Sequence, residues 1–331
     1  MTTAPIWITE AEVVSLIHLP DAVSALERIL LMEGEGGAQN MAKAHLMVGA
    51  NDAMHALGAS VAGAGICGFK TWINVAGKSS TVLTLFSLED GACLAVIEAT
   101  ALGQMRTASM TGVGTKRMAP EDADDMAIIG TGKQALTQVA ACAAVRPLKR
   151  VRVFSRRPEA RAAFAEAVRA QFDMEIVVAD TLEDALKDAP IVTLITNATK
   201  PFVNASMLAR GAHVNVMGAI VPARVEFTDD VFDRCDAIAV DNLVNIRELS
   251  AEFRARFGDD DAAWESVRPI SELVAEGFTR PPGCDLTLFK AMGMGISDLA
   301  LGIEILERAR KAGGSHTLPD RVRTPPRLKA D

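Results

Sequence analysis

The feature that most constrains the fold is a regular alternation of apolar segments and helix-like segments from residue 126 to residue 199. Strand-like runs at 126–130, 151–155, 175–179 and 191–199 are separated by helical segments that start at Lys133, Pro158 and Leu182. Parallel strands need long crossover connections, so this alternation is typical of a parallel sheet with crossover helices. Further strands are expected at 213–219 and 237–242, and the sheet is expected to end near Pro269. The middle of the chain is therefore predicted to be a doubly wound α/β domain.

The first strand of this region is followed by the motif GxGxxA, residues 130–135. Gly130 permits a tight turn, Gly132 allows the backbone to approach a pyrophosphate, and Ala135 allows close helix packing. The start of the following helix adds positive potential. An ordinary strand-to-helix turn is the alternative, but the motif's position predicts a Rossmann dinucleotide site that also includes Thr131, Lys133 and Gln134.

The end of the second strand carries Ser155, Arg156 and Arg157 in place of the acidic residue that binds the ribose of NAD. A serine and two arginines suit a 2′-phosphate, which favours NADP(H), with NAD(H) as a possibility. Alternatively, both arginines are solvated residues at a helix start. Later strand ends lie on the same edge of the sheet and add further candidate cofactor residues, namely Asn197, Ala198, Thr199, Met217 and Gly218.

The regions on either side of this domain have a different pattern. Two short helices are expected within residues 9–32, β-structure with a hairpin turn at Glu89–Gly91 within residues 58–93, and a helix at 100–117. Residues 120–125 look like a linker, and the amphipathic segment 296–312 returns to the first domain. The tail from Gly313 is expected to be loose. A chain of 331 residues suits two domains.

Composition excludes several classes of function. A net charge of -8 argues against a nucleic-acid partner, which would need a basic face. The N-terminus lacks a basic segment before an apolar core, and no apolar run reaches about 18 residues, so neither export nor a membrane partner is expected. Five cysteines without CxxC spacing indicate neither a disulfide framework nor a metal site. A reducing cytoplasm fits best.

Candidate substrate residues are cations in apolar surroundings. Lys70 lies within an apolar strand, where it points either to solvent or into a site in which burial lowers its pKa. Arg106 lies on a helix with few charges and is either a surface residue or a fork for a carboxylate. Lys43 and His45 are further polar candidates in an apolar stretch.

Taken together, these segments resemble the ornithine cyclodeaminase and mu-crystallin family, which includes ketimine reductases, pyrroline-2-carboxylate reductases and certain alanine dehydrogenases. The resemblance covers nearly the whole chain, and its most specific pairing is an RTA segment ahead of GTGxQA. It is carried by GFKTWINV, STVLTLFSLEDG, ALGQMRTAS, GTKRMA, IIGTGKQA, HVNVMGA and FKAMGMGISDLA.

The resemblance implies a homodimer with a substrate and dimerisation domain built from residues 1–119 and 291–331. A Rossmann domain at 120–290 is inserted between these two parts. It also implies roles for individual residues: Lys70 and Arg106 at the reacting centre with Asp298, Lys43 as a substrate residue, Arg106 and Thr81 near the cofactor, and Lys290 beside the nicotinamide site.

Two positions depart from the family pattern. The cyclodeaminases carry an aspartate where this chain has Ile220, and isoleucine cannot exchange protons. The family's upstream substrate arginine is replaced by Lys43, which keeps the charge but loses the bidentate fork.

The hypothesis from sequence is reduction of a 2-imino acid, such as pyrroline-2-carboxylate, to an L-amino acid. Lys43 and Arg106 would hold the carboxylate, and Lys70 would orient the substrate or deliver a proton. Three alternatives stay open: ornithine cyclodeamination, deamination of the alanine dehydrogenase type, and non-catalytic binding of a dinucleotide or a small ligand.

Overall fold

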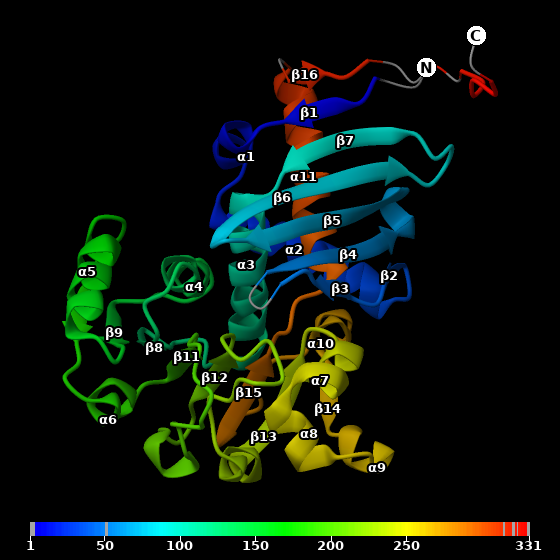
Figure 1. The fold of residues 1–331 in the computed structure, drawn as a ribbon. Helices are drawn as coiled ribbons and strands as arrows, with labels where there is room; N and C mark the ends of the chain where they lie inside the picture. Colours follow the sequence, from blue (N-terminus) through cyan, green and yellow to red (C-terminus); the bar gives the residue numbers. More distant parts are fainter. Residues whose placement is uncertain (1–3, 50–51, 314, 320–321, 323, 330–331) are drawn as a thin grey trace.

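A computed structural model describes residues 4–49, 52–313, 315–319, 322 and 324–329 of the chain. Within these residues it contains two eight-stranded sheets, which lie one above the other in Figure 1. The upper sheet is mixed and the lower sheet is parallel. The predicted fold class, a doubly wound parallel sheet combined with a second α+β unit, is confirmed.

The mixed sheet has the strand order β16-β1-β7-β6-β5-β4-β2, with β3 paired to β4. Strands β4 to β7 form an antiparallel meander, and the turn expected at Glu89–Gly91 joins β6 to β7. The tail after Gly313 was expected to be loose, but β16 pairs with β1. The strands of this sheet are β1 (Ile6–Ile8), β2 (Ala38–Asn40), β3 (Ala44–Met47), β4 (Ala53–Val61), β5 (Ile66–Val75), β6 (Lys78–Ser87), β7 (Cys93–Glu98) and β16 (His316–Thr317).

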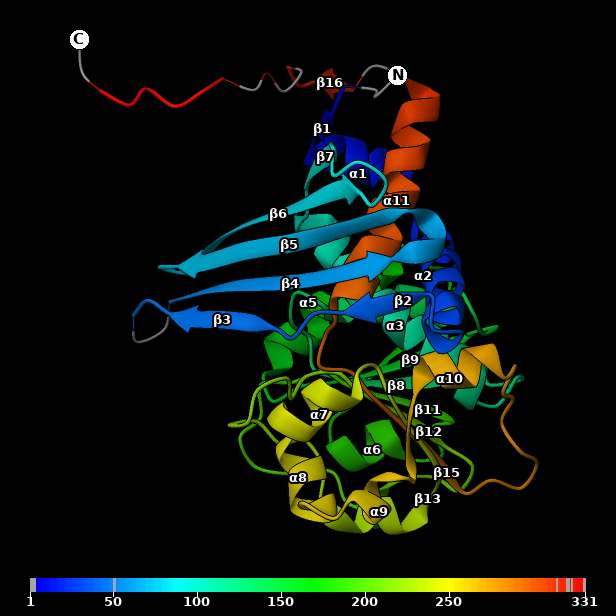
Figure 2. The same ribbon diagram turned by 90° about the vertical axis from the view of Figure 1, so that its right-hand side faces the viewer.

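Helices from both ends of the chain pack on one face of the mixed sheet (Figures 1 and 2). These are α1 (Glu10–Leu16), α2 (Leu19–Gly34), α3 (Thr100–Met118) and α11 (Gly295–Ala312). Helix α11 contacts β4, β5 and β6 as well as α2 and α3, so residues about 230 positions apart share one apolar core. This packing brings the C-terminal helix to the N-terminal strands, as its amphipathic pattern predicts.

The parallel sheet has the order β10-β9-β8-β11-β12-β15-β13-β14. Its strands are β8 (Asp125–Ile129), β9 (Arg150–Phe154), β10 (Glu175–Val178), β11 (Ile191–Leu194), β12 (His213–Val216), β13 (Cys235–Val240), β14 (Val267–Pro269) and β15 (Leu286–Lys290). The helices that accompany it are α4 (Ala135–Ala143), α5 (Pro158–Arg169), α6 (Leu182–Leu186), α7 (Leu243–Leu249), α8 (Ala251–Phe257), α9 (Asp261–Trp264) and α10 (Ile270–Ala275). Short 3-10 turns are η1 (Ala62–Ala64), η2 (Ala205–Met207) and η3 (Asp229–Arg234).

One expectation for this sheet was wrong. The sheet does not end near Pro269, because β15 lies between β12 and β13. All five residues of β15 are buried, the polar Thr287 and Lys290 included, so its sequence shows a short, mostly apolar run without the alternation of a half-buried strand. Such a run cannot be told from a buried piece of helix by periodicity.

The chain passes twice between the two sheets. Helix α3 leads to β8 through residues 119–124, and β15 leads to α11 through residues 291–294. The domain boundaries at 119/120 and 290/291 stay a prediction.

In the described part of the chain, no helix is long and apolar enough to cross a membrane.

Candidate active site

Three charged side chains from distant parts of the chain meet under the mixed sheet. The Lys70 ammonium, on β5, lies 2.7 Å from Oδ1 of Asp298 on α11. The Nε atom of Arg106, on α3, lies 3.1 Å from the same oxygen. Lys70 and Asp298 are buried, and the Lys70 ammonium lies 4.9 Å from the centre of the Trp72 ring. The structure therefore brings together the three residues expected at the reacting centre.

The pKa of Lys70 is lowered to about 8, first by burial and then by the nearby Arg106 charge. Asp298 acts in the opposite direction, because its carboxylate stabilises the ammonium through charge and a hydrogen bond. Asp298 lies in the first turn of α11, where the helix dipole favours a negative charge. The ammonium can thus exchange a proton near neutral pH.

Two polar atoms of this cluster are buried without a hydrogen-bond partner among the described residues. They are Oδ2 of Asp298 and Nε of Arg106, whose contact with Asp298 is an ion pair without hydrogen-bond geometry. Buried polar atoms are nearly always paired in folded proteins, so exceptions need an explanation. The polar groups of this cluster are therefore not all satisfied within the described part of the chain.

Arg106 also lines a pocket of about 530 Å³ between the two sheets. The pocket joins the charged cluster to the carboxyl ends of the parallel strands, where ligands bind in such sheets. Its walls include seven of the predicted cofactor residues, among them Met217 directly after β12. The full lining is Arg106, Thr107, Met110, Gly132, Lys133, Gln134, Ile195, Thr196, Asn197, Met217, Gly218, Ile220, Arg224, Asp241, Ala291, Met292, Gly293 and Ser297.

The glycine-rich turn has the geometry that the motif predicts. Gly130 has φ +118°, and a Cβ there would lie 2.4 Å from the carbonyl oxygen of Ile195. Gly132 has open space at its Cβ position, so a ligand can approach its backbone. Ala135 is buried at the start of α4, which begins two residues later than predicted from Lys133.

Ser155, Arg156 and Arg157 lie at the end of β9, beside this turn. The Thr131 hydroxyl donates to the Ser155 oxygen at 3.2 Å, so the two strand ends are in direct contact. Both arginines are exposed. Their role toward a cofactor stays a prediction.

Lys290 is placed differently from the sequence expectation. Its ammonium is fully buried, donates to the carbonyl oxygen of Ala219 at 2.7 Å and lies 3.7 Å from Glu252. It does not line the pocket. Lys290 instead holds the 218–219 segment through its bond to the Ala219 carbonyl, from the end of β15, which pairs with β12 in the same sheet.

Glu226 supports the same wall, and sequence reasoning missed it. Its carboxylate accepts hydrogen bonds from the backbone of Thr196, Gly218 and Ala219. A Cβ on Gly218 would lie 2.2 Å from the Thr196 nitrogen and 2.6 Å from Glu226, so only glycine fits between them. Burial raises the pKa of Glu226, and the charge of Lys290 opposes that rise.

Asp241 was also missed. It follows β13, is buried, and accepts hydrogen bonds from the backbone of Met292 at 3.0 Å and of Gly293 at 2.6 Å. It thereby holds the segment that leads to Asp298. Lys43 is half-buried near Asp241 and Arg106; burial lowers its pKa, as does the Arg106 charge. A carboxylate directly after a strand on the ligand-binding edge was the available signal for Asp241.

His45 and Thr81 lie outside the 530 Å³ pocket. Both line a second pocket of about 490 Å³ on β3 to β6. There His45 stacks on His55, and His55 stacks on Trp72 with ring centres 4.6 Å apart. This second pocket reaches the Lys70 cluster through Trp72 alone. Ala198 and Thr199 continue the 196–197 wall, beyond the lining residues of the first pocket.

The described residues include no group of three or more His, Cys, Asp or Glu side chains placed to hold a metal ion.

The family model for the ornithine cyclodeaminase/mu-crystallin family matches residues 5–313. The chain belongs to this family. The resemblance stated from sequence is confirmed.

Relatives within the ornithine cyclodeaminase/mu-crystallin family support this placement. A Delta(1)-pyrroline-2-carboxylate reductase from Bacillus cereus is 28% identical over 236 residues, which cover 70% of this chain and 72% of that protein. The ketimine reductase mu-crystallin of Mus musculus is 27% identical over 65% of both chains.

Solved structures share the fold. The Thermococcus litoralis Delta(1)-pyrroline-2-carboxylate reductase, in complex with NADH and L-proline, has a TM-score of 0.87 at 22% identity. It covers 95% of this chain and all of its own. An archaeal alanine dehydrogenase dimer with bound NAD has the same TM-score at 24% identity, covering 96% of this chain and 99% of its own.

Ile220, the position at which the sequence resemblance predicts a difference from the cyclodeaminases, lines the pocket and is 37% exposed. Its side chain has no group that can exchange a proton. The pocket wall therefore offers an apolar surface at this point.

Proposed function

We propose that the protein reduces a 2-imino acid to an L-amino acid with a nicotinamide cofactor. Membership of a family that contains pyrroline-2-carboxylate and ketimine reductases supports an oxidoreductase that acts on carbon–nitrogen bonds. The observation that carries the proposal is the buried Lys70–Asp298–Arg106 cluster, whose unpaired atoms lie next to the pocket of the glycine-rich turn. Such a site combines a proton source with carboxylate recognition and a dinucleotide cradle.

In this proposal the residues have separate roles. Arg106 and Lys43 bind the substrate carboxylate. Lys70 holds a proton that passes to the imine nitrogen, or keeps that nitrogen protonated, and Asp298 keeps Lys70 charged. The bound cofactor supplies the hydride that adds to the imine carbon, so one hydride and one proton together convert C=N to CH–NH.

The apolar wall at Ile220 supports reduction over cyclodeamination. Loss of ammonia from an amino acid and ring closure need a group that moves protons at the amine. The aspartate of the cyclodeaminases is absent from this wall. Reduction needs one proton, which Lys70 can supply.

The test is the oxidation of NADPH and of NADH at 340 nm. The panel contains pyrroline-2-carboxylate, piperideine-2-carboxylate, and pyruvate, glyoxylate or oxaloacetate with ammonia or methylamine. Rapid oxidation with one imine is expected. Ammonia release from ornithine without net oxidation would replace the proposal with cyclodeamination, and tight dinucleotide binding without any turnover would replace it with a binding protein.

For the cofactor, we propose a preference for NADPH. The exposed Arg156 and Arg157 beside Ser155 support it, because charge-assisted hydrogen bonds to a 2′-phosphate contribute about 1.5–3 kcal/mol. Replacing both by glutamine should weaken NADPH binding by about tenfold or more and leave NADH binding nearly unchanged. Equal losses for both cofactors, measured by fluorescence titration, would refute the preference. Arg254→Gln, on an exposed part of α8, is the control.

For assembly, we propose a homodimer through residues 1–119 and 291–331, with 120–290 as the inserted Rossmann domain. The sheet face turned away from α11 is rich in exposed apolar side chains, including Phe69, Ile73, Met54 and Leu46. A contiguous patch of this kind is typical of an interface. Phe69→Glu with Ile73→Glu should give a monomer in light scattering; an unchanged mass would place the interface elsewhere.

A further inference from the structure

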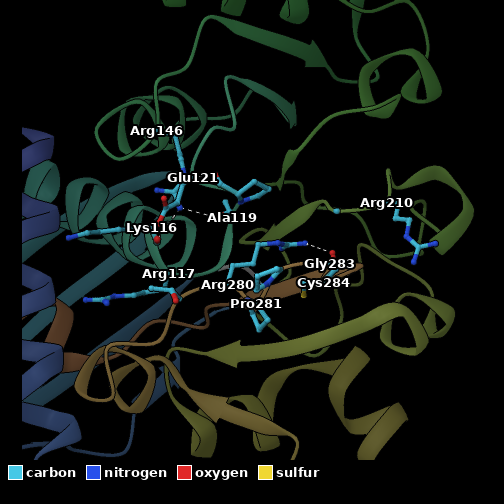
Figure 3. Close-up of a pocket in the computed structure, with 14 residues that line it drawn as sticks. Lys116, Arg117, Ala119, Glu121, Arg146, Arg210, Arg280, Pro281, Gly283 and Cys284 are labelled. Atoms are coloured by element: carbon cyan, nitrogen blue, oxygen red, sulfur yellow. Dashed lines mark hydrogen bonds between the residues drawn. The ribbon is translucent and has the colours of Figure 1, made fainter.

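A third pocket, also of about 490 Å³ and lined by charged residues, lies at the edge of the parallel sheet opposite the glycine-rich turn (Figure 3). It surrounds the end of α3 and the segments that precede β8, β12 and β15. One carboxylate, Glu121, lies in its lining. Its five cations are Lys116, Arg117, Arg146, Arg210 and Arg280. A local excess of positive charge is unusual in a chain with a net charge of -8.

Two of these cations are hydrogen-bonded to uncharged groups. Arg146 is 8% exposed and donates to the carbonyl oxygens of Thr115, Lys116, Ala119, Pro120 and Val145. Arg280 donates to the carbonyl oxygens of Met118 and Cys284 and to the Thr287 hydroxyl. These bonds fix both guanidinium groups at the end of α3, where the helix dipole compensates part of their charge. No bond in either set involves a carboxylate.

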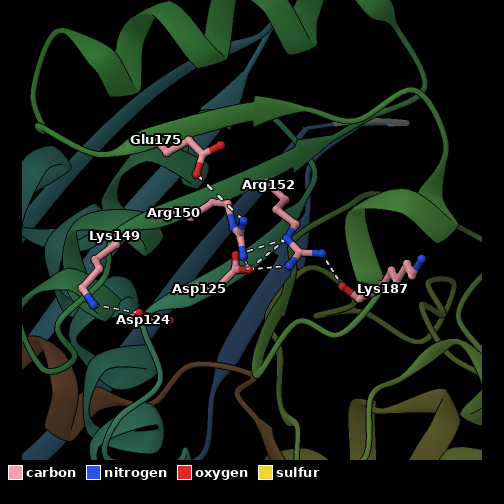
Figure 4. Close-up of polar contacts among 7 residues, drawn as sticks. All are labelled: Asp124, Asp125, Lys149, Arg150, Arg152, Glu175 and Lys187. Carbon is pink, nitrogen blue, oxygen red and sulfur yellow. Dashed lines mark hydrogen bonds and ion pairs between the residues drawn. The ribbon is translucent and has the colours of Figure 1, made fainter.

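A neighbouring cluster at the same sheet edge shows the contrast (Figure 4). There the buried Asp125 carboxylate accepts hydrogen bonds from Arg150 at 2.9 Å and from Arg152 at 3.0 Å. Lys149 pairs with Asp124 at 3.0 Å. In that cluster three cations face three carboxylates, Asp124, Asp125 and Glu175, so the charges balance.

The other cations of the pocket add to its positive field. Lys116 and Arg117 share a single carboxylate, Glu27, at 2.6 and 2.5 Å. The Arg117 Nε is buried without a hydrogen-bond partner among the described residues. Arg210 is exposed at the rim. Five cations therefore lie near three carboxylates, Glu121 in the lining and Glu27 and Asp285 outside it.

We propose that this pocket binds a small polyanion that carries phosphate or carboxylate groups. Fixed guanidinium groups match the oxygens of either group, and the pocket volume exceeds that of a single phosphate. The site is separate from the dinucleotide site, which lies at the other edge of the sheet. This inference does not depend on the reaction proposed above.

The test is calorimetric titration of the full chain with pyrophosphate and with citrate. Saturating dinucleotide is present throughout, so that the glycine-rich turn is occupied. The pocket variant combines Lys116→Gln and Arg210→Gln, and the control combines Lys187→Gln and Arg254→Gln, which remove two exposed charges elsewhere. We expect the pocket variant to weaken binding by about tenfold and the control by less than about twofold.

The outcomes separate the two sources of the anion. Binding of pyrophosphate alone would identify a phosphate site, and binding of citrate alone a carboxylate site; binding of both would identify recognition by charge. No binding of either anion, or equal weakening in the pocket and control variants, would overturn the proposal.

Amide hydrogen exchange gives a second measurement on the unmodified protein. The bound anion should slow exchange in residues 119–121 and 279–284 while leaving residues 130–135 unchanged. Protection confined to residues 130–135 would assign the binding to the dinucleotide site and reject the new pocket.

Discussion

Lys70 and Lys290 are both buried lysines beside carboxylates, but their surroundings differ. Lys290 donates to a carbonyl oxygen, and the neighbouring Glu226 and Glu252 carboxylates accept hydrogen bonds from backbone groups and from a serine hydroxyl. Around Lys70, one oxygen of Asp298 and one nitrogen of Arg106 are left without hydrogen bonds among the described residues. The first cluster is complete within the chain, and the second is incomplete.

This difference distinguishes a cluster that stabilises local structure from a cluster suited to take part in a reaction. A buried ion pair whose groups are all hydrogen-bonded fixes local structure, since breaking it leaves a charge in a medium of low dielectric constant. Unpaired buried atoms instead have an energetic reason to meet a ligand. The comparison therefore supports the proposed role of Lys70 in the reaction, and Lys290 holds the wall of the pocket.

The largest expected effect is on catalysis. Lys70→Met removes the proton source and should lower kcat for imine reduction by about 10³-fold, within the range reported for general acid catalysis. Dinucleotide affinity, followed by fluorescence, should stay within about twofold because Lys70 does not line the 530 Å³ pocket. Full activity of the Lys70→Met variant would contradict the catalytic role that the comparison with Lys290 gives to Lys70.

The next effect is on stability. Lys290→Met leaves Glu252 and Glu226 buried without a cation and should lower the free energy of unfolding by about 3–5 kcal/mol. Urea denaturation measures this change, with Lys187→Met as the exposed control. A variant of normal stability that cannot reduce imines would show that Lys290, too, takes part in the reaction.

The smallest effect is a shift in pH dependence. The pKa of Lys70 is about 8, so activity that needs its ammonium should fall as the pH rises through that value. Asp298 raises this pKa, and Asp298→Asn should therefore move the falling limb of kcat/KM to lower pH by about one unit, which corresponds to about 1.4 kcal/mol.

Glu226→Gln is the matched control, because Glu226 contacts the pocket wall and not Lys70. In the Glu226→Gln variant, the falling limb of the kcat/KM profile should stay near pH 8. If the falling limb moved to higher pH in Asp298→Asn, or moved by the same amount in both variants, the electrostatic role given to Asp298 would be contradicted.

Much of the fold was predictable because its signals are local. The alternation of residues 126–199 predicts the parallel sheet, and Gly130–Ala135 follow its first strand as expected. Strand β15 was missed because a five-residue apolar run carries no period. Its position between β12 and β13 depends on long-range pairing.

The site was predictable in part. Lys70 and Arg106 were candidates as cations in apolar surroundings, Asp298 was added by the family resemblance, and the structure brings the three together. Glu226 was missed because a carboxylate that binds backbone amides looks like any surface acid in sequence. Asp241 was missed although its place directly after a strand on the ligand-binding edge was a signal. The face of the sheet to which the Lys290 side chain points was also not predictable. A strand residue can point to either face, and packing selects which one.

The sequence by itself determined the order of strands and helices, the glycine-rich turn and the family, since these depend on residues close together in the chain. Only the tertiary structure decided which charges meet. Asp298 reaches Lys70 across 228 positions, and Lys290 points away from the pocket that its neighbours line. The physical reason is that burial and pairing give a charged side chain its pKa and its role, and both come from segments that meet only in the folded chain.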